Sequence, residues 1–501
     1  MTTPRWLAGA VGLVLLVGGL AACEQDKAPS AQRSTTPPAP TSQNPTSSTS
    51  AISSGSDADY PEAESVPRED PVYSRVGNPV VDALHYDLTL DWSGTAGVLT
   101  GTEELTFRAA EDSATIPLDF SSALKLSRVS LDGKDAGFQQ KGADLVVKRA
   151  VQKDQEHVLT LEYAGTPRPA AAPTTRGDFS LVGWQSDTDN GTSYTMQEPY
   201  GAFTWYAVND QPSDKAFYDI SVTTPQDLTG VANGTLESNR TTNGKRTTRW
   251  HLGSPAASYL ITVATGRYAH LEGESKSGVP LQVWAPPDNE ALNDRLLRML
   301  TRAVDWDEAH LGPLPFDSLG LVVVDMNSAM ETQTMLTLGN NQYTLSAPVI
   351  THESVHQWYG DTVSPKDWRD VWMNEGMTMY LQWCFEADSS PKGITTIGSI
   401  VADNTRNLGA LVKQGGPPAD YDPSGFGLSN IYVVPAVMWH RLRLKLGDEE
   451  FWRLVKQWPQ DHRWSNADYA EITSWWSQKT GLDLQPYFDS WLKKGTPTEV
   501  P

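Results

Sequence analysis

The spacing of apolar residues changes once along this chain, and that change limits the folds open to it. Between residues 75 and 270 apolar and polar residues alternate, as they do at Tyr86, Leu88, Leu90 and Trp92. A period of two is typical of strands with one buried face, and short turn segments lie between the alternating runs. Residues 71–272 are therefore expected to form an antiparallel, β-sandwich-like domain.

After residue 290 the period lengthens to that of a helix. Apolar residues recur three or four positions apart until a helix stop at Gly312-Pro313, and a short apolar run at 319–324 predicts a buried strand. Residues 273–501 are therefore expected to be mostly helical with a small sheet, which makes the fold class α+β multidomain. The further helices are expected at about 346–360, 372–387, 430–446 and 448–457.

The first 70 residues have a different composition. An apolar run, too short to span a bilayer, ends in Leu20-Ala21-Ala22-Cys23, which resembles a bacterial lipobox. Residues 1–22 are expected to be a lipoprotein signal peptide and Cys23 the acylated first residue; the alternative is an uncleaved membrane anchor. Residues 23–70 are rich in Ser, Thr and Pro and predict a disordered tether. The protein is then expected outside the cytoplasm, anchored to the cell membrane by lipid.

Charge and cysteine content exclude other classes. A formal net charge of −22 would repel phosphate backbones and anionic headgroups, so no nucleic-acid partner is expected. If Cys23 is acylated, Cys384 remains alone and no intramolecular disulfide forms; Cys384 is expected to be a buried, unreactive thiol. A monomer is expected.

The residues that carry chemistry begin at His352-Glu353-Ser354-Val355-His356, which places two imidazoles on one face of a helix. Glu375 follows after 18 intervening residues, at the start of the next expected helix. Two imidazoles and one carboxylate suit one zinc ion with a fourth position open for water, although cobalt or manganese fit the same ligands. Glu353 lies too far round the helix to be a ligand and is expected to be the general base.

The spacing H-E-x-x-H-x18-E resembles that of the gluzincin aminopeptidases related to aminopeptidase N and leukotriene A4 hydrolase. Gln357-Trp358-Tyr359-Gly360-Asp361 and Trp372-Met373-Asn374-Glu375-Gly376 add to the likeness, which covers about residues 75–495. The resemblance implies a thermolysin-like catalytic domain, one Zn²⁺ per chain, peptide substrates and the removal of N-terminal residues.

The resemblance also assigns roles outside the zinc ligands. Ser328-Ala329-Met330-Glu331-Thr332 occupies the place of the family's Gly-x-Met-Glu-Asn strand, so Glu331 is expected to bind the substrate's free α-amine, with Ala329 and Met330 as substrate contacts. Met196-Gln197-Glu198-Pro199 matches a segment that helps to hold that amine, and Glu198 is the candidate. Tyr432 is expected to stabilise the oxyanion through its phenol donor.

Two departures from the family pattern leave alternatives open. Ser328 and Thr332 replace Gly and Asn, and Val433-Val434-Pro435 replaces Glu-Lys-Gly after Tyr432. Because these changes weaken the case for an amine pocket, a zinc endopeptidase with the same His₂Glu core is the first alternative. An inactive zinc-containing cell-surface binding protein is the second.

Three further polar residues are considered as metal ligands or as residues that orient them. Asp370 lies close to Glu375 in sequence and is a candidate to orient a zinc ligand, although a solvated loop carboxylate is an equal alternative. His310 and His440 have no partner at metal-binding spacing and are expected to be structural.

Overall fold

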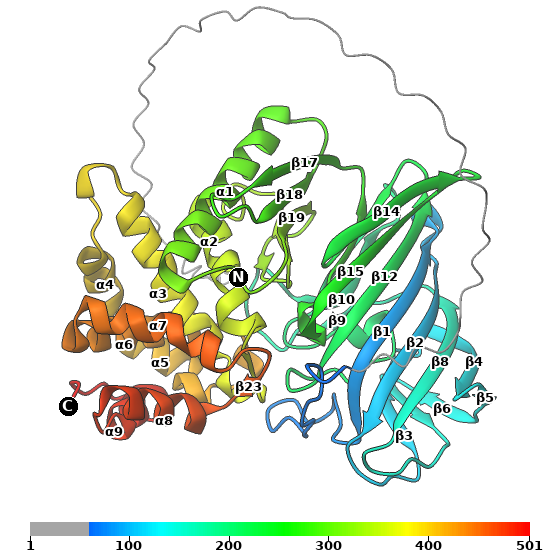
Figure 1. Ribbon diagram of the computed structural model, residues 1–501, viewed down its shortest axis with the longest axis horizontal. Helices are drawn as coiled ribbons and strands as arrows, with labels where there is room; N and C mark the ends of the chain where they lie inside the picture. The colour runs from blue at the N-terminus through cyan, green and yellow to red at the C-terminus, as the bar shows by residue number, and fades with distance from the viewer. Residues whose placement is uncertain (1–59) are drawn as a thin grey trace, which may run out of the picture. The chain divides into compact units, whose positions relative to one another are not determined.

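The computed structural model describes residues 60–501. The predicted signal peptide, Cys23 and most of the predicted tether lie outside the described residues. Strands dominate the first half of the described chain and helices the second (Figure 1). The α+β class expected from the change of period is confirmed.

The largest sheet of the first half has eight strands, with β1 (Val81–Trp92) near its middle (Figure 1). Tyr86, Leu88, Leu90 and Trp92 of β1 are all at most 1% exposed, as the alternation predicts. The strand order is β14 (Thr235–Thr242), β15 (Lys245–Ala257), β12 (Lys215–Pro225), β1, β2 (Leu99–Ala109), β8 (Glu156–Gly165), β4 (Leu124–Leu131) and β5 (Lys134–Asp135).

Two smaller sheets complete the first half. The five-stranded sheet packs on the large one through β13, where Thr248 Oγ1 donates to the carbonyl of Gly230 (2.7 Å). Its order is β13 (Thr229–Ala232), β16 (Val263–Gly266), β11 (Thr192–Met196), β10 (Leu181–Asp187) and β9 (Ala170–Ala171). The three-stranded sheet has the order β3 (Ile116–Asp119), β7 (Asp144–Val147) and β6 (Phe138–Lys141).

The expectation of a purely antiparallel domain is wrong at one pair. β1 and β12 run parallel, with His85 opposite Phe217 and Asp91 opposite Thr223, whereas the other pairs of the large sheet are antiparallel. A parallel neighbour needs a long connection, and here the chain from β2 to β11 intervenes between the two strands. Alternation along each strand is the same in both cases, so the sequence pattern does not distinguish them.

The second half contains a mixed five-stranded sheet and nine α-helices among the described residues. The predicted boundary at residue 272 falls inside the first strand of this sheet. The sheet order is β17 (Ala269–Glu274), β18 (Pro280–Ala285), β19 (Leu319–Val324), β21 (Met335–Gly339) and β20 (Ala329–Met330). The helices are α1 (Glu290–Leu311), α2 (Ala347–Val355), α3 (Trp372–Ser389), α4 (Ile397–Thr405), α5 (Leu408–Gly415), α6 (Ser429–Leu446), α7 (Asp448–Asp461), α8 (Tyr469–Thr480) and α9 (Gln485–Phe488).

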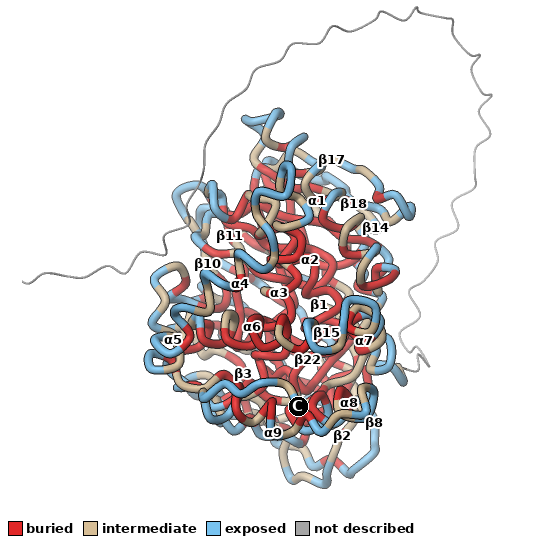
Figure 2. The backbone as a smooth tube through the Cα atoms, turned by 90° about the vertical axis from the view of Figure 1, so that its left-hand side faces the viewer, coloured by how far each residue is buried: buried red, intermediate tan, exposed pale blue. Residues whose placement is uncertain are grey.

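Helices α2 and α3 are the most deeply buried pair, as the colouring of Figure 2 shows. Every residue of α2 from Val349 onward is buried, whereas α5 buries only its two end residues. A helix buried on all sides brings its polar residues into the interior, where they need partners. The histidines and glutamates of α2 and α3 are such residues.

Helix α2 ends sooner than predicted. The pattern predicts a helix over 346–360, but α2 ends at Val355 and an irregular turn follows over residues 357–361. Tyr359 and Gly360 leave helical geometry, and Gly360 has φ of 132°, which favours glycine. The turn lies against the first half of the chain, since Tyr259 Oη donates to the carbonyl of Gly360 (3.1 Å).

A buried lysine of the first half holds the end of the same turn. Lys215 begins β12, and its Nζ donates to the carbonyls of Asp361 (2.9 Å) and Thr362 (3.1 Å). Burial lowers the pKa of Lys215 to about 7, although Asp361 acts in the opposite direction. The β-rich half therefore positions the turn that follows the two histidines.

The predicted tether is too long at its C-terminal end. Within residues 60–70, Ala63 is fully buried, Arg68 Nη2 donates to Asp367 Oδ2 (2.7 Å) and Asp70 Oδ2 accepts from the Trp368 amide (2.8 Å). These residues are held mainly by side-chain hydrogen bonds, which leave no hydrophobic period in the sequence. Composition alone therefore could not separate them from the tether.

Two further expectations concern single residues and membrane spans. Cys384 is buried, and burial raises the pKa of its thiol to about 12, which fits the expected unreactive thiol. Among residues 60–501, no helix is both long enough and apolar enough to cross a membrane.

Gly376 brings α3 close to α6 beside the Glu375 position. A Cβ at Gly376 would lie 2.4 Å from Cγ of Pro435, which occupies the family's glycine position after Tyr432. We expect Gly376→Ala to push the helices apart and lower the free energy of unfolding by about 1–3 kcal/mol, measured by chemical denaturation. Gly409→Ala on α5, where a Cβ meets nothing within 4 Å, is the matched control. Equal stability of the two variants would contradict the close packing.

Candidate metal centre and active site

Helices α2 and α3 bring the three predicted zinc ligands together. The Nε2 atoms of His352 and His356 lie 3.2 Å and 3.4 Å from the same oxygen of Glu375. All three side chains are buried, and their ligand atoms lie within 4.8 Å of one another. The i, i+4 spacing on α2 and the first turn of α3 thus produce the predicted constellation.

The hydrogen bonds of the two histidine Nδ1 atoms show which nitrogen of each ring is left to bind a cation. His352 Nδ1 donates to Gln382 Oε1 (3.0 Å), whose amide is oriented by Glu386, and His356 Nδ1 donates to the carbonyl of Tyr359 (2.9 Å). Because Nδ1 of each ring donates to another residue, Nε2 is the nitrogen left to bind a cation beside the Glu375 carboxylate. Two Nε2 atoms and one carboxylate converge, and zinc is the cation that this donor set fits.

The irregular turn after α2 positions a hydrogen-bond acceptor for His356. Because the chain leaves the helix at Tyr359, the carbonyl of that residue points back to His356 instead of continuing the helical ladder. A Cβ at Gly360 would lie 3.3 Å from His356 Nδ1 and from Asn374 Nδ2. The turn therefore orients one ligand, and a side chain at position 360 would press on His356 and Asn374.

Glu353 lies beside the ligands without joining them. Its carboxylate groups with Glu331 and His356, with ligand atoms within 4.8 Å of one another. Burial raises the pKa of Glu353 well above its usual range, His356 acts against this and Glu331 adds to it. A carboxylate with a raised pKa holds a proton more readily than a solvated one, as a general base must.

Glu198 and Glu331 form an acidic pair next to the candidate metal centre. Glu198, Glu331 and Glu375 offer oxygens within 4.8 Å of one another, although Glu198 comes from the first half of the chain. Burial raises the pKa of Glu198 and of Glu331, and the Glu331 charge raises that of Glu198 further. The Oε1 atom of each is buried without a hydrogen-bond partner in the structure.

Neighbouring residues explain why Glu198, and not Gln197, faces the centre. Gln197 Nε2 donates to the carbonyls of Ser258 (2.6 Å) and Ile261 (2.7 Å), and its Oε1 accepts from Trp205 Nε1 (2.8 Å). The amide of Gln197 is thus fully used inside the β-rich half. Glu198 is left to line the cleft.

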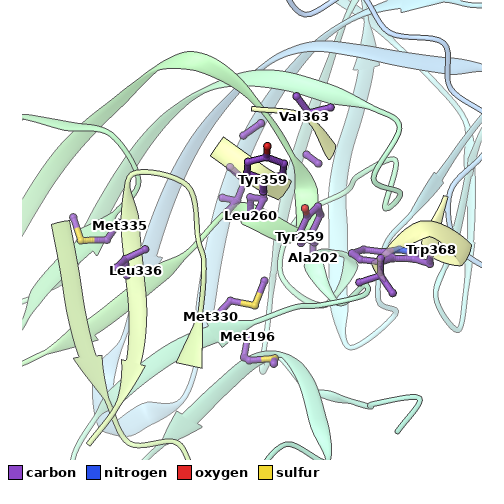
Figure 3. Close-up of a cluster of buried hydrophobic side chains, with 14 of the residues drawn as sticks. Met196, Ala202, Tyr259, Leu260, Met330, Met335, Leu336, Tyr359, Val363 and Trp368 are labelled. Atoms are coloured by element: carbon purple, nitrogen blue, oxygen red, sulfur yellow. The ribbon is translucent and has the colours of Figure 1, made fainter. Parts of the chain in front are cut away.

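The side chains of the predicted substrate-binding segment, residues 328–332, point in two directions. Ser328, Ala329 and Glu331 line the cleft, but Met330 does not, and it is 1% exposed in the hydrophobic core shown in Figure 3. Successive side chains of a strand point to opposite faces, so Met330 must turn away when its neighbours face the cleft. The Met330 side chain is therefore not available to substrate, and the predicted contact through Met330 is left to its backbone.

Ser328 and Thr332, which depart from the family pattern, each make a hydrogen bond in the structure. Ser328 Oγ donates to Asp178 Oδ2 (3.2 Å), and the hydroxyl of Thr332 lies 2.9 Å from that of Thr337 in the buried sheet. Neither change displaces Glu331 from the cleft. The departures are therefore compatible with an intact acidic pair.

Tyr432 lies in the first turn of α6 and lines the same cleft. Its ring centroid is 6.1 Å from that of His352, and its Oη accepts a hydrogen bond from Arg176 Nη1 (3.3 Å). Burial raises the pKa of Tyr432 well above its usual range, so the phenol keeps its proton at neutral pH. It is placed to donate to a group bound at the metal centre.

Three polar residues of the cleft were not found from the sequence: Arg176, Tyr343 and Gln382. Tyr343 is 59% exposed in the loop before α2, and Arg176 lies in a segment without periodicity, so neither carried a signal. Gln382 follows Glu375 by seven positions, two turns along the same face of α3, and that spacing could have indicated it.

Asp370 does not orient a zinc ligand. Its oxygens accept from Trp372 Nε1 (3.0 Å) and from the Tyr469 amide (2.9 Å), so it joins α3 to α8 instead. Proximity in sequence to Glu375 was misleading because the start of a helix turns the side chains of neighbouring residues in different directions. His310 donates to the Trp306 carbonyl (2.7 Å) and His440 lies 3.1 Å from Tyr380 Oη, as expected of structural histidines.

Comparison with known proteins agrees with this geometry. Residues 82–260 match the sequence profile described as "Peptidase M1 N-terminal domain", and residues 317–491 match "Peptidase family M1 domain". The mouse glutamyl aminopeptidase is 24% identical over an alignment covering 97% of this chain and 54% of that protein. Aminopeptidase N of Lactobacillus delbrueckii subsp. lactis is 23% identical, covering 81% and 50%. The chain spans about half the length of the curated relatives it matches.

Solved structures share the fold at similarly low identity. An M1 zinc metallopeptidase from Deinococcus radiodurans superposes with a TM-score of 0.75 at 23% identity, covering 86% of this chain and 98% of that one. Aminopeptidase A of Legionella pneumophila gives a TM-score of 0.69 at 19% identity, covering 84% of this chain and 50% of that one.

The contact of Gln382 with His352 predicts a role in metal affinity. Gln382→Ala removes the acceptor that orients the His352 ring, and we expect zinc affinity to fall roughly 10- to 100-fold. Competition with a chelator of known affinity measures the change. Gln485→Ala, a glutamine of α9 that contacts Tyr469 and Asp489, is the control. Unchanged affinity in Gln382→Ala would show that His352 does not depend on this contact.

Proposed function

Because the chain belongs to peptidase family M1, we propose that it is a zinc aminopeptidase that removes N-terminal residues from peptides. The observation that carries the proposal is the acidic pair Glu198 and Glu331, each buried with one oxygen lacking a partner beside the metal ligands. A buried carboxylate without a partner is costly, and a substrate ammonium group would supply the missing partner. Endopeptidase substrates present no such cation.

His352, His356 and Glu375 would hold the zinc ion in this proposal. When bound there, zinc supplies Lewis-acid polarisation of the scissile carbonyl and lowers the pKa of water. Gln382 and the Tyr359 carbonyl fix the rings, so the lone pairs stay directed inward.

The remaining steps fall to residues of the cleft. Glu198 and Glu331 pair with the α-ammonium and so place the first peptide carbonyl at the centre. Glu353 takes a proton from the attacking water as the carbon–oxygen bond forms, and returns it to the nitrogen as the carbon–nitrogen bond breaks. Tyr432 donates its phenol hydrogen to the carbonyl oxygen as negative charge develops there.

The test is hydrolysis of a panel of aminoacyl fluorogenic amides and their N-acetylated counterparts by the full-length chain in detergent. We expect turnover of the free-amine substrates alone, and its loss with a chelator. Glu353→Gln should lower kcat by roughly 100- to 10,000-fold while zinc content stays unchanged. Glu331→Gln should lower kcat/KM for free-amine substrates by roughly 10- to 100-fold, because an ammonium loses a charged acceptor.

Two outcomes would lead elsewhere. Cleavage of acetylated peptides would move the assignment to an endopeptidase with the same metal ligands. Absence of turnover with one zinc ion bound per chain would favour the second alternative, an inactive zinc-containing cell-surface binding protein. The control for these variants is Glu103→Gln in β2, which alters a buried carboxylate far along the chain from the motif. Glu386→Gln is unsuitable because Glu386 accepts a hydrogen bond from Gln382, which orients His352.

We also propose that the protein is a lipoprotein of the extracytoplasmic face of the cell membrane. The support is the sequence Leu20-Ala21-Ala22-Cys23 together with the Ser-, Thr- and Pro-rich segment after it. In cells fed a labelled fatty acid, we expect the wild-type chain to carry label and Cys23→Ala to carry none, with the variant released from the membrane fraction. Cys384→Ala is the matched control, and labelling of Cys23→Ala would overturn the proposal.

A further inference from the structure

The hydroxyl of Tyr432 is held by a residue from the other half of the chain. Arg176 Nη1 donates to Tyr432 Oη (3.3 Å) and to the carbonyl of Gly427 (3.1 Å), two residues before α6 begins. The segment around Arg176 is fastened at the same place, since Thr174 Oγ1 donates to the Phe426 carbonyl (2.6 Å) and the Phe426 amide donates to that of Pro173 (3.1 Å). The β-rich half thus reaches the start of the helix that carries Tyr432.

The direction of this hydrogen bond has a chemical consequence. A guanidinium group has donors and no acceptor, so the phenol oxygen must accept from Arg176 and its own hydrogen must point elsewhere. The Tyr432 ring lies beside His352 on the cleft side. We propose that Arg176 is a positioning residue that orients the Tyr432 hydroxyl as a donor towards the substrate carbonyl. The inference rests on the proposed peptidase function.

Arg176 is itself held in a fixed orientation. Its Nε donates to Asp178 Oδ1 (2.9 Å) and its Nη2 to Asp178 Oδ2, while Ser328 Oγ donates to that second oxygen (3.2 Å). Ser328 stands where the family has glycine, which has no hydroxyl to donate. The chain of contacts from Ser328 through Asp178 and Arg176 to Tyr432 therefore gives this departure a function.

A role for Arg176 in binding a substrate carboxylate fits the geometry less well. Four of its five N–H donors are used by Asp178, Gly427 and Tyr432, and Asp178 offsets its charge. The stacking of Arg176 over Phe179, 4.7 Å from the ring centroid, covers one face of the guanidinium as well. One N–H donor of the Arg176 guanidinium remains for a ligand.

The test compares Arg176→Met with Arg168→Met, an exposed arginine of the same segment, in the full-length zinc-loaded protein. Loss of an oxyanion donor costs about 100- to 1,000-fold in kcat, so misorientation of Tyr432 should lower kcat by roughly tenfold or more. KM for a neutral aminoacyl amide should change by less than about threefold, because ground-state binding does not use the bond. Arg168→Met should match the wild type, and both variants should bind one zinc ion per chain.

A double-mutant cycle distinguishes positioning from a general structural effect. In a Tyr432→Phe background, Arg176→Met should lower kcat by less than about twofold, because the hydroxyl it orients is gone. Ser328→Gly should lower kcat in the same direction but less. The affinity of a phosphinic dipeptide analogue of the tetrahedral state, measured by calorimetry, should show the same non-additivity.

Several outcomes overturn the inference. Arg176→Met with wild-type kcat, or losses that add fully to those of Tyr432→Phe, would mean that Arg176 does not act through Tyr432. A change confined to KM for substrates with a free carboxylate would make Arg176 a substrate-binding residue instead. If the wild type cleaves no free-amine substrate, the proposed function fails, and the analogue-binding cycle still decides the role of Arg176.

Discussion

The convergence of two imidazole Nε2 atoms on one oxygen of Glu375 constrains the rest of this structure. His352, His356 and Glu375 are buried, so the helices that carry them must be buried too, and α2 and α3 lie inside the second half. Such a group favours a bound cation, because the Glu375 carboxylate is held away from water beside the two ring nitrogens. Gln382 and the Tyr359 carbonyl hold the rings in place, and Gly376 lets α6 approach beside Glu375.

The second half of the chain does not complete the site alone. Glu198 supplies one member of the acidic pair, Arg176 reaches Tyr432, and Lys215, at the start of β12, holds the turn after His356. Each is polar, and each is at least partly removed from solvent where the two halves meet. The interface between the halves therefore serves chemistry as much as stability, which explains why it contains buried charges that an apolar contact would avoid.

Much of the fold follows from periodicity because burial of one face imposes it. Alternation in β1 and helical spacing in α1 both predicted the observed elements, and both reflect a side chain's distance from the core. The pattern failed where hydrogen bonds rather than burial fix the chain. The parallel pairing of β1 with β12, the early end of α2 and the ordered residues 60–70 are such places.

The sequence by itself determined that His352, His356 and Glu375 come together, that Glu353 lies beside them, and the fold class. The ligands are encoded by spacing along helices, and spacing is a local property that survives without knowledge of the rest of the chain. The tertiary structure alone decided which of Gln197 and Glu198 faces the centre, that Met330 turns into the core, and that Arg176 meets Tyr432. Those facts depend on contacts between distant parts of the chain, 61 positions apart for Gln197 and Ser258 and 256 for Arg176 and Tyr432, and no local pattern in the sequence records which residues will touch.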